Sequence, residues 1–523
     1  MDGQRKLPIG IQDFESLRKD GYLYVDKTES IYKMISTGRY YFLSRPRRFG
    51  KSLLMSTIHA YFSGKKELFD GTIGQRLYIA DKSDCTWNVH PVLHLDLNTN
   101  KYDEEGVLEI KLNESLSQWE NLYNCSREDL SFGMRFENII KTARAKTGHR
   151  VVILVDEYDK PMLQAIGNHE LQNANRDTLK GFYGALKSMD GCIKFALLTG
   201  VTKFGKISVF SDLNNLNDIS MDANYWDICG VTEEELTNQF QPEINALAET
   251  NNISKNECID TLRERYDGYH FKENVPGIYN PFSVICTLNK KNFGSYWFET
   301  GTPTYLVELL KGYNYNLENL SGVETDADTL NSIDSTSNNP IPVIYQSGYL
   351  TIKDYDKEFG TYTLDFPNKE VEDGFLRFLL PYYTSVPKGD TAFSIKLFVK
   401  DVREGNTEEF IKRLKSLFAD TPYELVKDLE NHYQNAIWLL SKLMGFYVQA
   451  EYHTSEGRID LVLQTNKFCY VMEFKLDGTA EEALNQICDK HYTLPFEIND
   501  QTIIRIGLNF NSKTRNIENY LIS

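Results

Sequence analysis

Three neighbouring residues, Gly50, Lys51 and Ser52, have the types and the spacing of a phosphate-binding loop. They follow an apolar run and a basic turn, and they precede a helical pattern. At such a junction, backbone N–H groups hold phosphate oxygens, the lysine contacts the β- and γ-phosphates, and the hydroxyl binds Mg²⁺. The strict motif has a glycine where this sequence has Arg45. On these residues alone, a nucleotide site and a basic loop before a helix are equally good interpretations.

Two carboxylates further along the chain favour the nucleotide site. Asp156 and Glu157 follow the apolar run 151–155, which is typical of a strand covered on both faces. The carboxyl ends of parallel strands face the ligand crevice, so both side chains are expected beside the loop. Asp156 then holds Mg²⁺ through water, and Glu157 polarises an attacking water. A pair of solvated carboxylates at a strand end is the minority interpretation.

Thr199 is a further predicted part of this site. It closes a mostly apolar run that begins at residue 193, where its hydroxyl can sense the γ-phosphate. Thr202 and Lys203 compete for that role, and a simple strand cap is an equally good interpretation. The residues predicted to contact the nucleotide or its metal are therefore Arg48, Phe49, Gly50, Lys51, Ser52, Asp156 and Thr199.

A second set of residues that could do chemistry lies in the segment 457–476. Asp460 belongs to one strand-like run and Glu473 to the next, with a polar turn between the two runs. Because side chains alternate along a strand, Glu473 and Lys475 share one face. A turn centred between residues 466 and 467 puts Asp460 directly opposite Glu473.

Opposed carboxylates of this kind indicate a metal-dependent hydrolytic site. Like charges at directly paired positions destabilise a hairpin, and a divalent cation between Asp460 and Glu473 removes that cost. Lys475 is then placed to orient or deprotonate the attacking water, or to offset charge on a scissile phosphate. The alternative is a surface hairpin held by salt bridges.

Two residues on neighbouring helices are candidates for the same site. Glu430 lies at the edge of the apolar stripe of a helix predicted over about residues 423–443, where its carboxylate is a further candidate metal ligand. Gln486, in the helix predicted after the hairpin, is a candidate polar contact. For each, an exposed surface position is an equally good interpretation. The predicted metal ligands are Ser52 and Asp156 in the first site and Glu430, Asp460 and Glu473 in the second.

The segments that carry these residues predict an α/β protein in three parts. Residues 1–215 alternate strand-like and helix-like runs, which is typical of a parallel sheet with crossover helices. Residues 216–388 are mostly helical and can act as a lid, and residues 389–523 form a second α/β unit. The strands expected in the first part are 40–44, 91–97, 151–155 and 193–199. A small antiparallel element is expected over 341–367.

Composition agrees with an ordinary folded protein. Of the 523 residues, 41% are hydrophobic and 25% are charged, which excludes collagen-like, low-complexity and disulfide-scaffold proteins. No apolar run approaches the roughly 18 residues of a membrane span, and the first residues lack the apolar stretch of a signal peptide. The eight cysteines show no CxxC spacing and are interpreted as reduced thiols, which predicts a cytoplasmic protein. A net charge of −17 argues against a general nucleic-acid coat but permits a local basic channel.

Several stretches of the sequence resemble the AAA-ATPase-like family of bacterial proteins. They are residues 7–14, 24–28, 43–52, 155–161, 266–269, 279–283 and 297–301. The resemblance covers nearly the whole chain and implies a P-loop NTPase with an additional catalytic glutamate, which takes ATP and Mg²⁺. An arginine at the first position of the loop is the norm in this family, so Arg45 is compatible with ATP binding.

Residues 405–515 resemble the PD-(D/E)xK phosphodiesterase superfamily, in the form often fused to this ATPase-like domain. The resemblance rests on Asp460 and on the Glu473-x-Lys475 pattern, on adjacent strands with helices before and after them. It implies a nuclease that uses Mg²⁺, with Mn²⁺ as a second candidate. The predicted catalytic residues are Glu157, Asp460, Glu473 and Lys475. An inactive descendant that only binds is the alternative.

Together these features predict an ATP-dependent or ATP-gated, metal-dependent nuclease that hydrolyses phosphodiester bonds. DNA is favoured over RNA as the substrate, no membrane partner is expected, and a homo-oligomer is compatible with the sequence. The alternative is an NTP-binding switch or signalling module whose nuclease-like domain binds nucleic acid or protein without cutting. Crowding of arginines 39, 45, 47 and 48 around the phosphates fits the tight binding and slow turnover of such a module.

Overall fold

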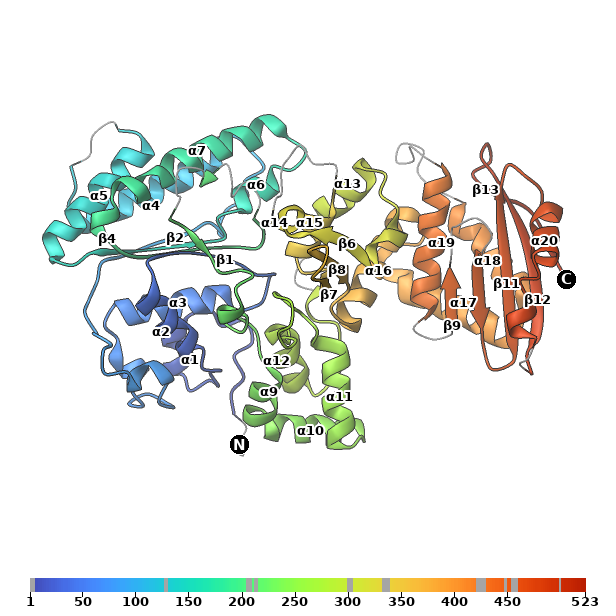
Figure 1. Cartoon of the computed structure of the whole chain (residues 1–523), viewed down its shortest axis with the longest axis horizontal. Helices are drawn as coiled ribbons and strands as arrows, with labels where there is room; N and C mark the ends of the chain where they lie inside the picture. The colour runs from blue at the N-terminus through green and yellow to red at the C-terminus, as the bar shows by residue number, and fades with distance from the viewer. Residues whose placement is uncertain are drawn as a thin grey trace. The chain divides into compact units, whose positions relative to one another are not determined.

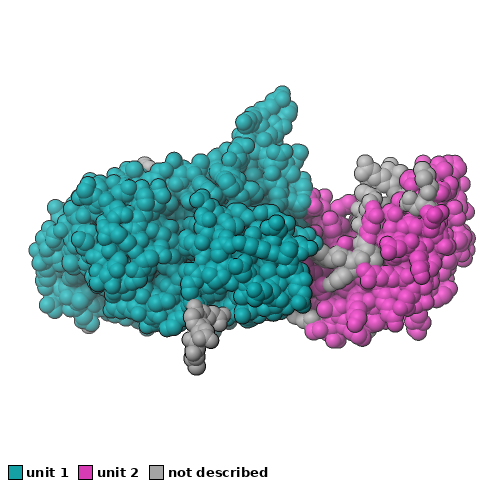
Figure 2. Space-filling model, turned by 90° about the horizontal axis from the view of Figure 1, so that it is seen from below, with its two compact units in different colours: residues 1–301, 322–370 teal, residues 302–321, 371–523 magenta. Residues whose placement is uncertain are grey.

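The computed structural model places the chain in two compact units, which Figure 2 shows in different colours. Unit 1 comprises residues 1–301 and 322–370, and unit 2 comprises residues 302–321 and 371–523. Residues of the region 216–388 thus belong to both units. The structure describes residues 5–126, 130–203, 209–210, 215–298, 304–331, 339–419, 429–445, 449–452, 460–497 and 500–523.

Unit 1 is built on a five-stranded parallel sheet with the order β2-β3-β4-β1-β5. The strands are β1 Tyr40–Ser44, β2 Val92–Asp96, β3 Val151–Asp156, β4 Ile193–Gly200 and β5 Asn217–Asp218. The first four agree with the expected strands, and their apolar side chains form the main core. The two-residue β5 is too short to leave a periodic pattern in the sequence.

Helices cover both faces of this sheet, as Figure 1 shows. On one face lie α4 Val107–Tyr123, α5 Phe132–Thr147, α6 Lys160–Gln164 and α7 His169–Ser188, and on the other lie α1 Phe14–Lys19, α2 Thr28–Thr37 and α3 Lys51–Phe62. Because β4 lies between β1 and β3, the carboxyl ends of these three strands meet at one edge. That edge brings together the loop before α3, Thr199 and Asp156.

The rest of unit 1 is a helical group and a small sheet. The helices α9 Glu233–Gln239, α10 Gln241–Asn251, α11 Lys255–Tyr266 and α12 Pro281–Lys290 share their own apolar core. The antiparallel sheet has the order β6-β8-β7, with β6 Val323–Asp326, β7 Thr351–Asp356 and β8 Thr361–Asp365. Two short helices, α14 Ala327–Asn331 and α15 Ile341–Gln346, accompany it.

The first part of the antiparallel element expected over 341–367 was wrong, because Ile341–Gln346 is the helix α15. Pro342 occupies its first turn, where proline fits a helix, and Gly348, at a φ of 88°, follows its end. Ile341, Val343 and Ile344 are all buried, so the run shows no polar face from which a helical period could be recognised.

Unit 2 combines helices with a mixed sheet of order β13-β12-β11-β10-β9. Its helices are α13 Thr304–Gly312, α17 Thr391–Glu404, α18 Thr407–Phe418, α19 Leu429–Gly445 and α20 Ala480–Asp489, and α16 Lys369–Tyr383 starts in unit 1 and continues in unit 2. The strands are β9 Gln449–Tyr452, β10 Leu461–Gln464, β11 Phe468–Leu476, β12 Thr502–Asn511 and β13 Asn516–Ile522. The expected hairpin is β10–β11, and α20 is the crossover between the parallel strands β11 and β12.

Within the part of the chain that is described, none of the helices has the length and apolar character needed to cross a membrane. All eight cysteines lie among the described residues, and none of them belongs to a disulfide bond.

Candidate functional site

The basic loop of residues 45–50 joins β1 to α3 at the carboxyl edge of the sheet. Gly50 precedes the first helical residue with a φ of 96°, a left-handed conformation that glycine adopts without strain. The helix then starts directly at Lys51. A loop that turns into a helix N-terminus in this way presents backbone N–H groups to an anion.

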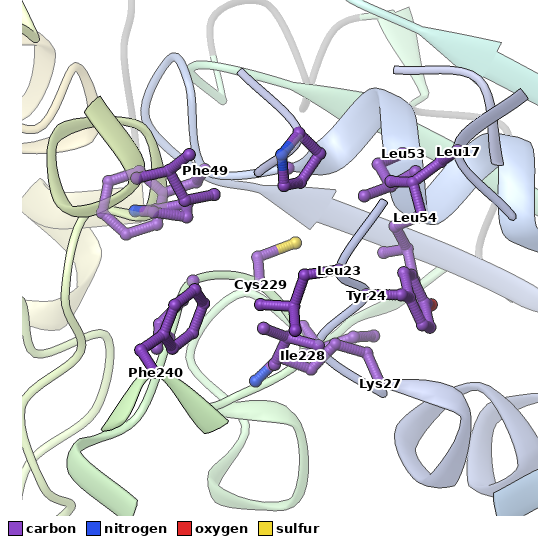
Figure 3. Close-up of a pocket in the computed structure, with 17 residues that line it drawn as sticks. Leu17, Leu23, Tyr24, Lys27, Phe49, Leu53, Leu54, Ile228, Cys229 and Phe240 are labelled. Atoms are coloured by element: carbon purple, nitrogen blue, oxygen red, sulfur yellow. The ribbon is translucent and has the colours of Figure 1, made fainter. Parts of the chain in front are cut away.

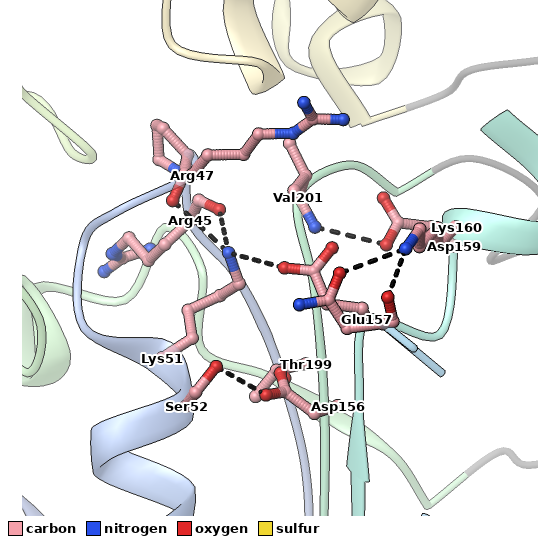
Figure 4. Close-up of polar contacts among 12 residues, drawn as sticks. Arg45, Arg47, Lys51, Ser52, Asp156, Glu157, Asp159, Lys160, Thr199 and Val201 are labelled. Atoms are coloured by element: carbon pink, nitrogen blue, oxygen red, sulfur yellow. Dashed lines mark hydrogen bonds and ion pairs between the residues drawn. The ribbon is translucent and has the colours of Figure 1, made fainter. Parts of the chain in front are cut away.

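Lys51 is buried at the centre of the site and contacts both sides of it (Figure 4). Its Nζ donates to the carbonyl oxygens of Arg45, at 3.0 Å, and Pro46, at 3.3 Å. It also lies 3.5 Å from Oε1 of Glu157. The lysine predicted to hold phosphates is thus already beside the glutamate predicted to activate water.

Ser52, Asp156 and Thr199 form one hydrogen-bonded group (Figure 4). Ser52 Oγ donates to Oδ2 of Asp156 over 2.7 Å, and Thr199 Oγ1 donates to Oδ1 of the same carboxylate. The Ser52 hydroxyl at the start of α3 and the Asp156 carboxylate at the end of β3 are oxygen ligands suited to Mg²⁺. Thr199 thereby holds the carboxylate of this group.

The two alternatives to Thr199 are engaged elsewhere. Thr202 donates through both its N–H and its hydroxyl to Oδ2 of Asp159. Lys203 pairs with Asp218 at 2.8 Å. Neither of these side-chain contacts is with Lys51 or Ser52, so Thr199 is the candidate that joins the predicted magnesium group.

Asp159 was not recognised from the sequence and is a buried part of the site's framework. Its carboxylate, 0% exposed, accepts N–H groups from Val201 and Thr202 at the end of β4 (Figure 4). Burial and the nearby Glu157 raise its pKa to about 6. These bonds tie the turn that carries Glu157, at a left-handed φ of 58°, to the neighbouring strand. The sequence did contain a signal for this residue, because Asp159 is a third carboxylate only two residues after the Asp156–Glu157 pair.

A cleft of about 430 Å³ lies over Lys51 and Ser52. Arg47, Arg48, Glu157 and Lys160 supply charged groups to its wall. The segment 8–12 and helix α12 add apolar groups to the wall, among them Pro8, Ile11, Phe282 and Ile285. The cleft therefore offers both charged and apolar groups, with the Arg48 guanidinium 5.1 Å from the ring centroid of Phe282, which suits the phosphates and the base of a nucleotide. The role of segment 8–12 was not recognised from the sequence.

A second, apolar pocket of about 90 Å³ adjoins the cleft at Gly50 (Figure 3). Its wall includes Leu23, Tyr24, Cys229 and Phe240. Phe49, predicted to contact the nucleotide, places its side chain here, among apolar groups. Its ring lies 4.8 Å from Tyr269 and 5.5 Å from Phe271, measured between ring centroids.

The arginines are not all gathered at the phosphate end, which corrects the expected crowding. Arg45 is 1% exposed, donates to the carbonyls of Ser44, Ser220 and Tyr225, and stacks its guanidinium 4.0 Å from the ring centroid of Phe271. Arg39 pairs loosely with Asp190, at 3.9 Å, just before β1 begins. Only Arg47 and Arg48 of the four belong to the cleft wall.

The backbone explains how Arg45 replaces a glycine. In this loop the left-handed φ values belong to Arg48 and Gly50, and position 45 adopts no positive φ. The conformational freedom of glycine is therefore not needed there. The loop is also held from behind, because Gly230 N–H donates to the carbonyl of Phe49 over 3.1 Å.

In unit 2 the hairpin register brings the second set of residues together. Leu461 pairs with Met472, so the preceding Asp460 lies opposite Glu473, as the turn centre predicted. Oδ2 of Asp460 accepts the N–H of Phe474 at 2.8 Å. Lys475 Nζ lies 3.2 Å from Oε1 of Glu473. Gln486 accepts a hydrogen bond from the same ammonium, which places this candidate beside the site.

The electrostatics of this pair fit a divalent cation. Burial, together with the Glu473 carboxylate, raises the pKa of Asp460 to about 7, and burial raises the pKa of Glu473 as well. Glu473 is 2% exposed, and its buried Oε2 has no hydrogen-bond partner among the described residues. Carboxylate oxygens are hard ligands for Mg²⁺ or Mn²⁺, so a cation here would replace the repulsion with ligation.

No third His, Cys, Asp or Glu side chain joins the pair within the described ranges. Glu430 belongs to α19, and its side chain lies outside what the structure describes.

Gly507 was not recognised from the sequence and shapes the same site. A Cβ on Gly507 would lie 2.4 Å from the carbonyl oxygen of Ala480, so only glycine lets α20 approach β12 so closely. Gly507 pairs with Glu473 in the parallel ladder. The close approach is what brings Gln486 of α20 to Lys475 of β11.

Comparison with known proteins finds a family model for each of the two regions that carry these residues. A family model described as "Predicted AAA-ATPase" matches residues 8–210, and a model of the PD-(D/E)XK nuclease superfamily matches residues 428–520. A protein of Azotobacter chroococcum mcd 1, described as an uncharacterized protein in the vnfD 5′ region, is 34% identical over 533 residues, which cover 99% of each chain. The chain belongs to the family of predicted AAA-ATPases and carries a domain of the PD-(D/E)XK nuclease superfamily.

Proposed function

We propose that the chain is an ATP-gated, metal-dependent nuclease that hydrolyses phosphodiester bonds in DNA. The observation that carries the proposal is the buried pair Asp460 and Glu473, directly opposed on adjacent strands with Lys475 beside them. Two such carboxylates are poorly tolerated without a cation between them. Nucleic acid is the substrate class to which the superfamily of this domain points.

In this proposal, nucleotide binding in unit 1 regulates the nuclease activity of unit 2. Lys51 would bind the β- and γ-phosphates, with Arg47 and Arg48 adding charge to the wall of the cleft. Ser52 and Asp156, already hydrogen-bonded to each other, would hold Mg²⁺.

The base would contact the apolar groups that the segment 8–12 and helix α12 add to the cleft wall. Phosphates that attract Lys51 would separate it from Glu157, whose carboxylate then becomes available to orient an attacking water.

In unit 2, Asp460 and Glu473 would hold Mg²⁺ or Mn²⁺. When bound, the cation makes a water more acidic and stabilises charge on the phosphate. Lys475, held by Glu473 and Gln486, would orient the water or offset charge on the scissile phosphate. Glu430 remains a candidate further ligand from α19.

A second function, a nucleotide-dependent switch that binds nucleic acid or protein without cutting, is favoured by one observation. Glu157 is engaged by Lys51 at 3.5 Å, and hydrolysis would be slow if this contact persisted when nucleotide is bound. Such a protein would bind ATP and a partner, and its unit 2 would show no metal-dependent cleavage.

The test is cleavage of plasmid, linear and single-stranded DNA and of an RNA pool, with Mg²⁺ or Mn²⁺ and ATP. The nuclease proposal expects DNA cleavage that disappears without the cation and falls at least about a hundredfold in Glu473→Ala. Glu481→Ala, at an exposed glutamate on α20, is the matched control and should cleave normally. ATP binding with no cleavage of any substrate would favour the switch instead.

A further inference from the structure

A buried carboxylate in unit 1 gathers hydrogen bonds from two separate segments. Oε1 of Glu370 accepts the backbone N–H groups of Tyr296, at 2.5 Å, and Trp297, at 2.9 Å. It also accepts the hydroxyl of Ser283 on α12, at 3.0 Å. Glu370 is 1% exposed, and burial raises its pKa to about 7, so these bonds hold a carboxyl group in a dry environment, where losing them is costly.

Trp297 connects this carboxylate to the nucleotide loop. Its indole Nε1 donates to the carbonyl oxygen of Arg47 over 3.0 Å, while its backbone N–H is held by Glu370. The ring is 5% exposed and packs against Tyr349, with the two ring centroids 5.1 Å apart. A movement of the Arg47 carbonyl therefore cannot be absorbed by free rotation of the indole.

The loop carbonyls next to Arg47 respond directly to Lys51. The ammonium of Lys51 donates to the carbonyls of Arg45 and Pro46, the two residues before Arg47. Phosphates that take the ammonium would leave these two carbonyls without that donor. The carbonyl that Trp297 holds, that of Arg47, therefore directly follows the two carbonyls whose hydrogen bonding would differ with and without nucleotide.

Glu370 is also the residue at which the last segment of unit 1 ends. Glu370 is the second residue of α16 Lys369–Tyr383, and the remainder of this helix, from Val371 on, belongs to unit 2. A helix is stiff along its hydrogen-bonded axis, so a change at its first turn reaches the following turns. A path of hydrogen bonds thus runs from the nucleotide loop through Trp297 to Glu370, at the start of the helix that continues in unit 2.

We propose that Trp297 and Glu370 are positioning residues that hold the nucleotide loop and transmit its nucleotide-bound state to helix α16. The proposal rests on the proposed function, because it assumes that the cleft over Lys51 takes ATP. It adds the route by which occupancy of that cleft reaches the unit that carries Asp460 and Glu473.

The test uses the full chain and Trp297→Phe, which keeps a ring but removes the N–H that bonds Arg47. Amide hydrogen exchange over residues 371–383 is measured with and without a non-hydrolysable ATP analogue and Mg²⁺. The wild type is expected to change its exchange rates in this helix at least about fivefold, the lower bound of a typical coupling between sites. Trp297→Phe, at an analogue concentration that saturates its cleft, should lose that change.

The matched control is Trp119→Phe, which makes the same replacement at a tryptophan stacked on Phe136 in the α4–α5 core. It should behave as the wild type. Glu370→Gln keeps the side-chain size and removes the charge, and it should also diminish the response of α16. If thermal melting shows that Trp297→Phe is poorly folded, the proposal is tested with Glu370→Gln instead.

The possible outcomes distinguish a failure of the proposed route through Trp297 and Glu370, called the relay below, from a failure of the proposed function. An analogue that binds the wild type without changing exchange in residues 371–383 would overturn the relay and leave ATP binding intact. An unchanged response in well-folded Trp297→Phe and Glu370→Gln would overturn it too. A wild type that binds no nucleotide would instead contradict the proposed function, and the relay with it.

Discussion

Lys51 and Glu157 hold each other in this structure, with 3.5 Å between Nζ and Oε1. The same ammonium donates to two loop carbonyls, so it is fully engaged within the protein. In the proposed mechanism the phosphates of ATP compete for Lys51, and Glu157 is released only when nucleotide is bound. Binding and activation of the attacking water are then a single event, which limits hydrolysis to the occupied cleft.

Replacing these two residues should have different effects. Lys51→Ala removes the main phosphate contact and should weaken ATP binding at least about tenfold, measured by calorimetry. Glu157→Gln removes the water-orienting carboxylate and weakens the hold on Lys51, so ATP should bind at least as tightly while hydrolysis falls about a hundredfold. Lys66→Ala, at an exposed lysine, is the control for loss of positive charge. Equal loss of binding in both variants would contradict the assigned roles.

Asp159→Asn should lower the rate of ATP hydrolysis while leaving the KM for ATP nearly unchanged. The amide keeps one oxygen acceptor for the three donors at Val201 and Thr202, so the turn that carries Glu157 loses its fixed position. The lost bonds should also lower the free energy of unfolding by about 1–3 kcal/mol. Urea denaturation and steady-state kinetics measure the two effects. Asp177→Asn, on the exposed side of α7, is the control.

Replacement of Arg45 should mainly affect the stability of the protein, and replacement of Arg47 should mainly affect ATP binding. Arg45→Gly restores the standard loop motif, yet it removes the three guanidinium hydrogen bonds to the carbonyls of Ser44, Ser220 and Tyr225 and should cost about 2 kcal/mol or more of stability. Arg47→Ala, at an exposed position of the cleft wall, should change stability little and weaken ATP binding. A more stable Arg45→Gly protein would show that this arginine is not structural.

Metal binding at unit 2 should depend steeply on pH. The folded-state pKa of Asp460 is raised to about 7 from 3.8, so below pH 7 the carboxyl carries a proton that the cation must displace. Affinity for Mn²⁺ should therefore fall by up to about tenfold per pH unit below 7 and level off above it. Titration calorimetry at pH 6 and pH 8 measures the difference, and Asp460→Asn should abolish it.

The same pKa shift predicts the effect of cation removal on stability. A carboxyl whose pKa is raised by folding destabilises the folded state as the pH rises from about 4 through 7, because the charged form is disfavoured there. Chelation with EDTA should therefore lower the melting temperature more at pH 8 than at pH 6. Asp460→Asn should melt at a temperature that responds little to chelation. An equal effect of EDTA at both pH values would argue against a metal at this pair.

The parts that could be predicted from the sequence are those governed by local pattern. The apolar runs that form β1, β3 and β4 could be recognised without knowing which segments they pack against, and so could the hairpin. The opposition of Asp460 and Glu473 followed from the length of one turn, because register is fixed once the turn centre is known.

The parts that escaped prediction depend on contacts between distant segments. Nothing local shows that Arg45 turns inward onto residues 220 and 225, or that Glu370 receives N–H groups from Tyr296 and Trp297. Helix α15 escaped because a fully buried apolar run has no period.

The most direct test of the account is the rate of DNA cleavage by the full chain, with Mg²⁺, as ATP is added. The account predicts that ATP changes the rate in the wild type and has no effect in Lys51→Ala, while Glu473→Ala does not cleave under either condition. Cleavage that requires Glu473 but is the same with and without ATP, and the same in Lys51→Ala, would contradict it.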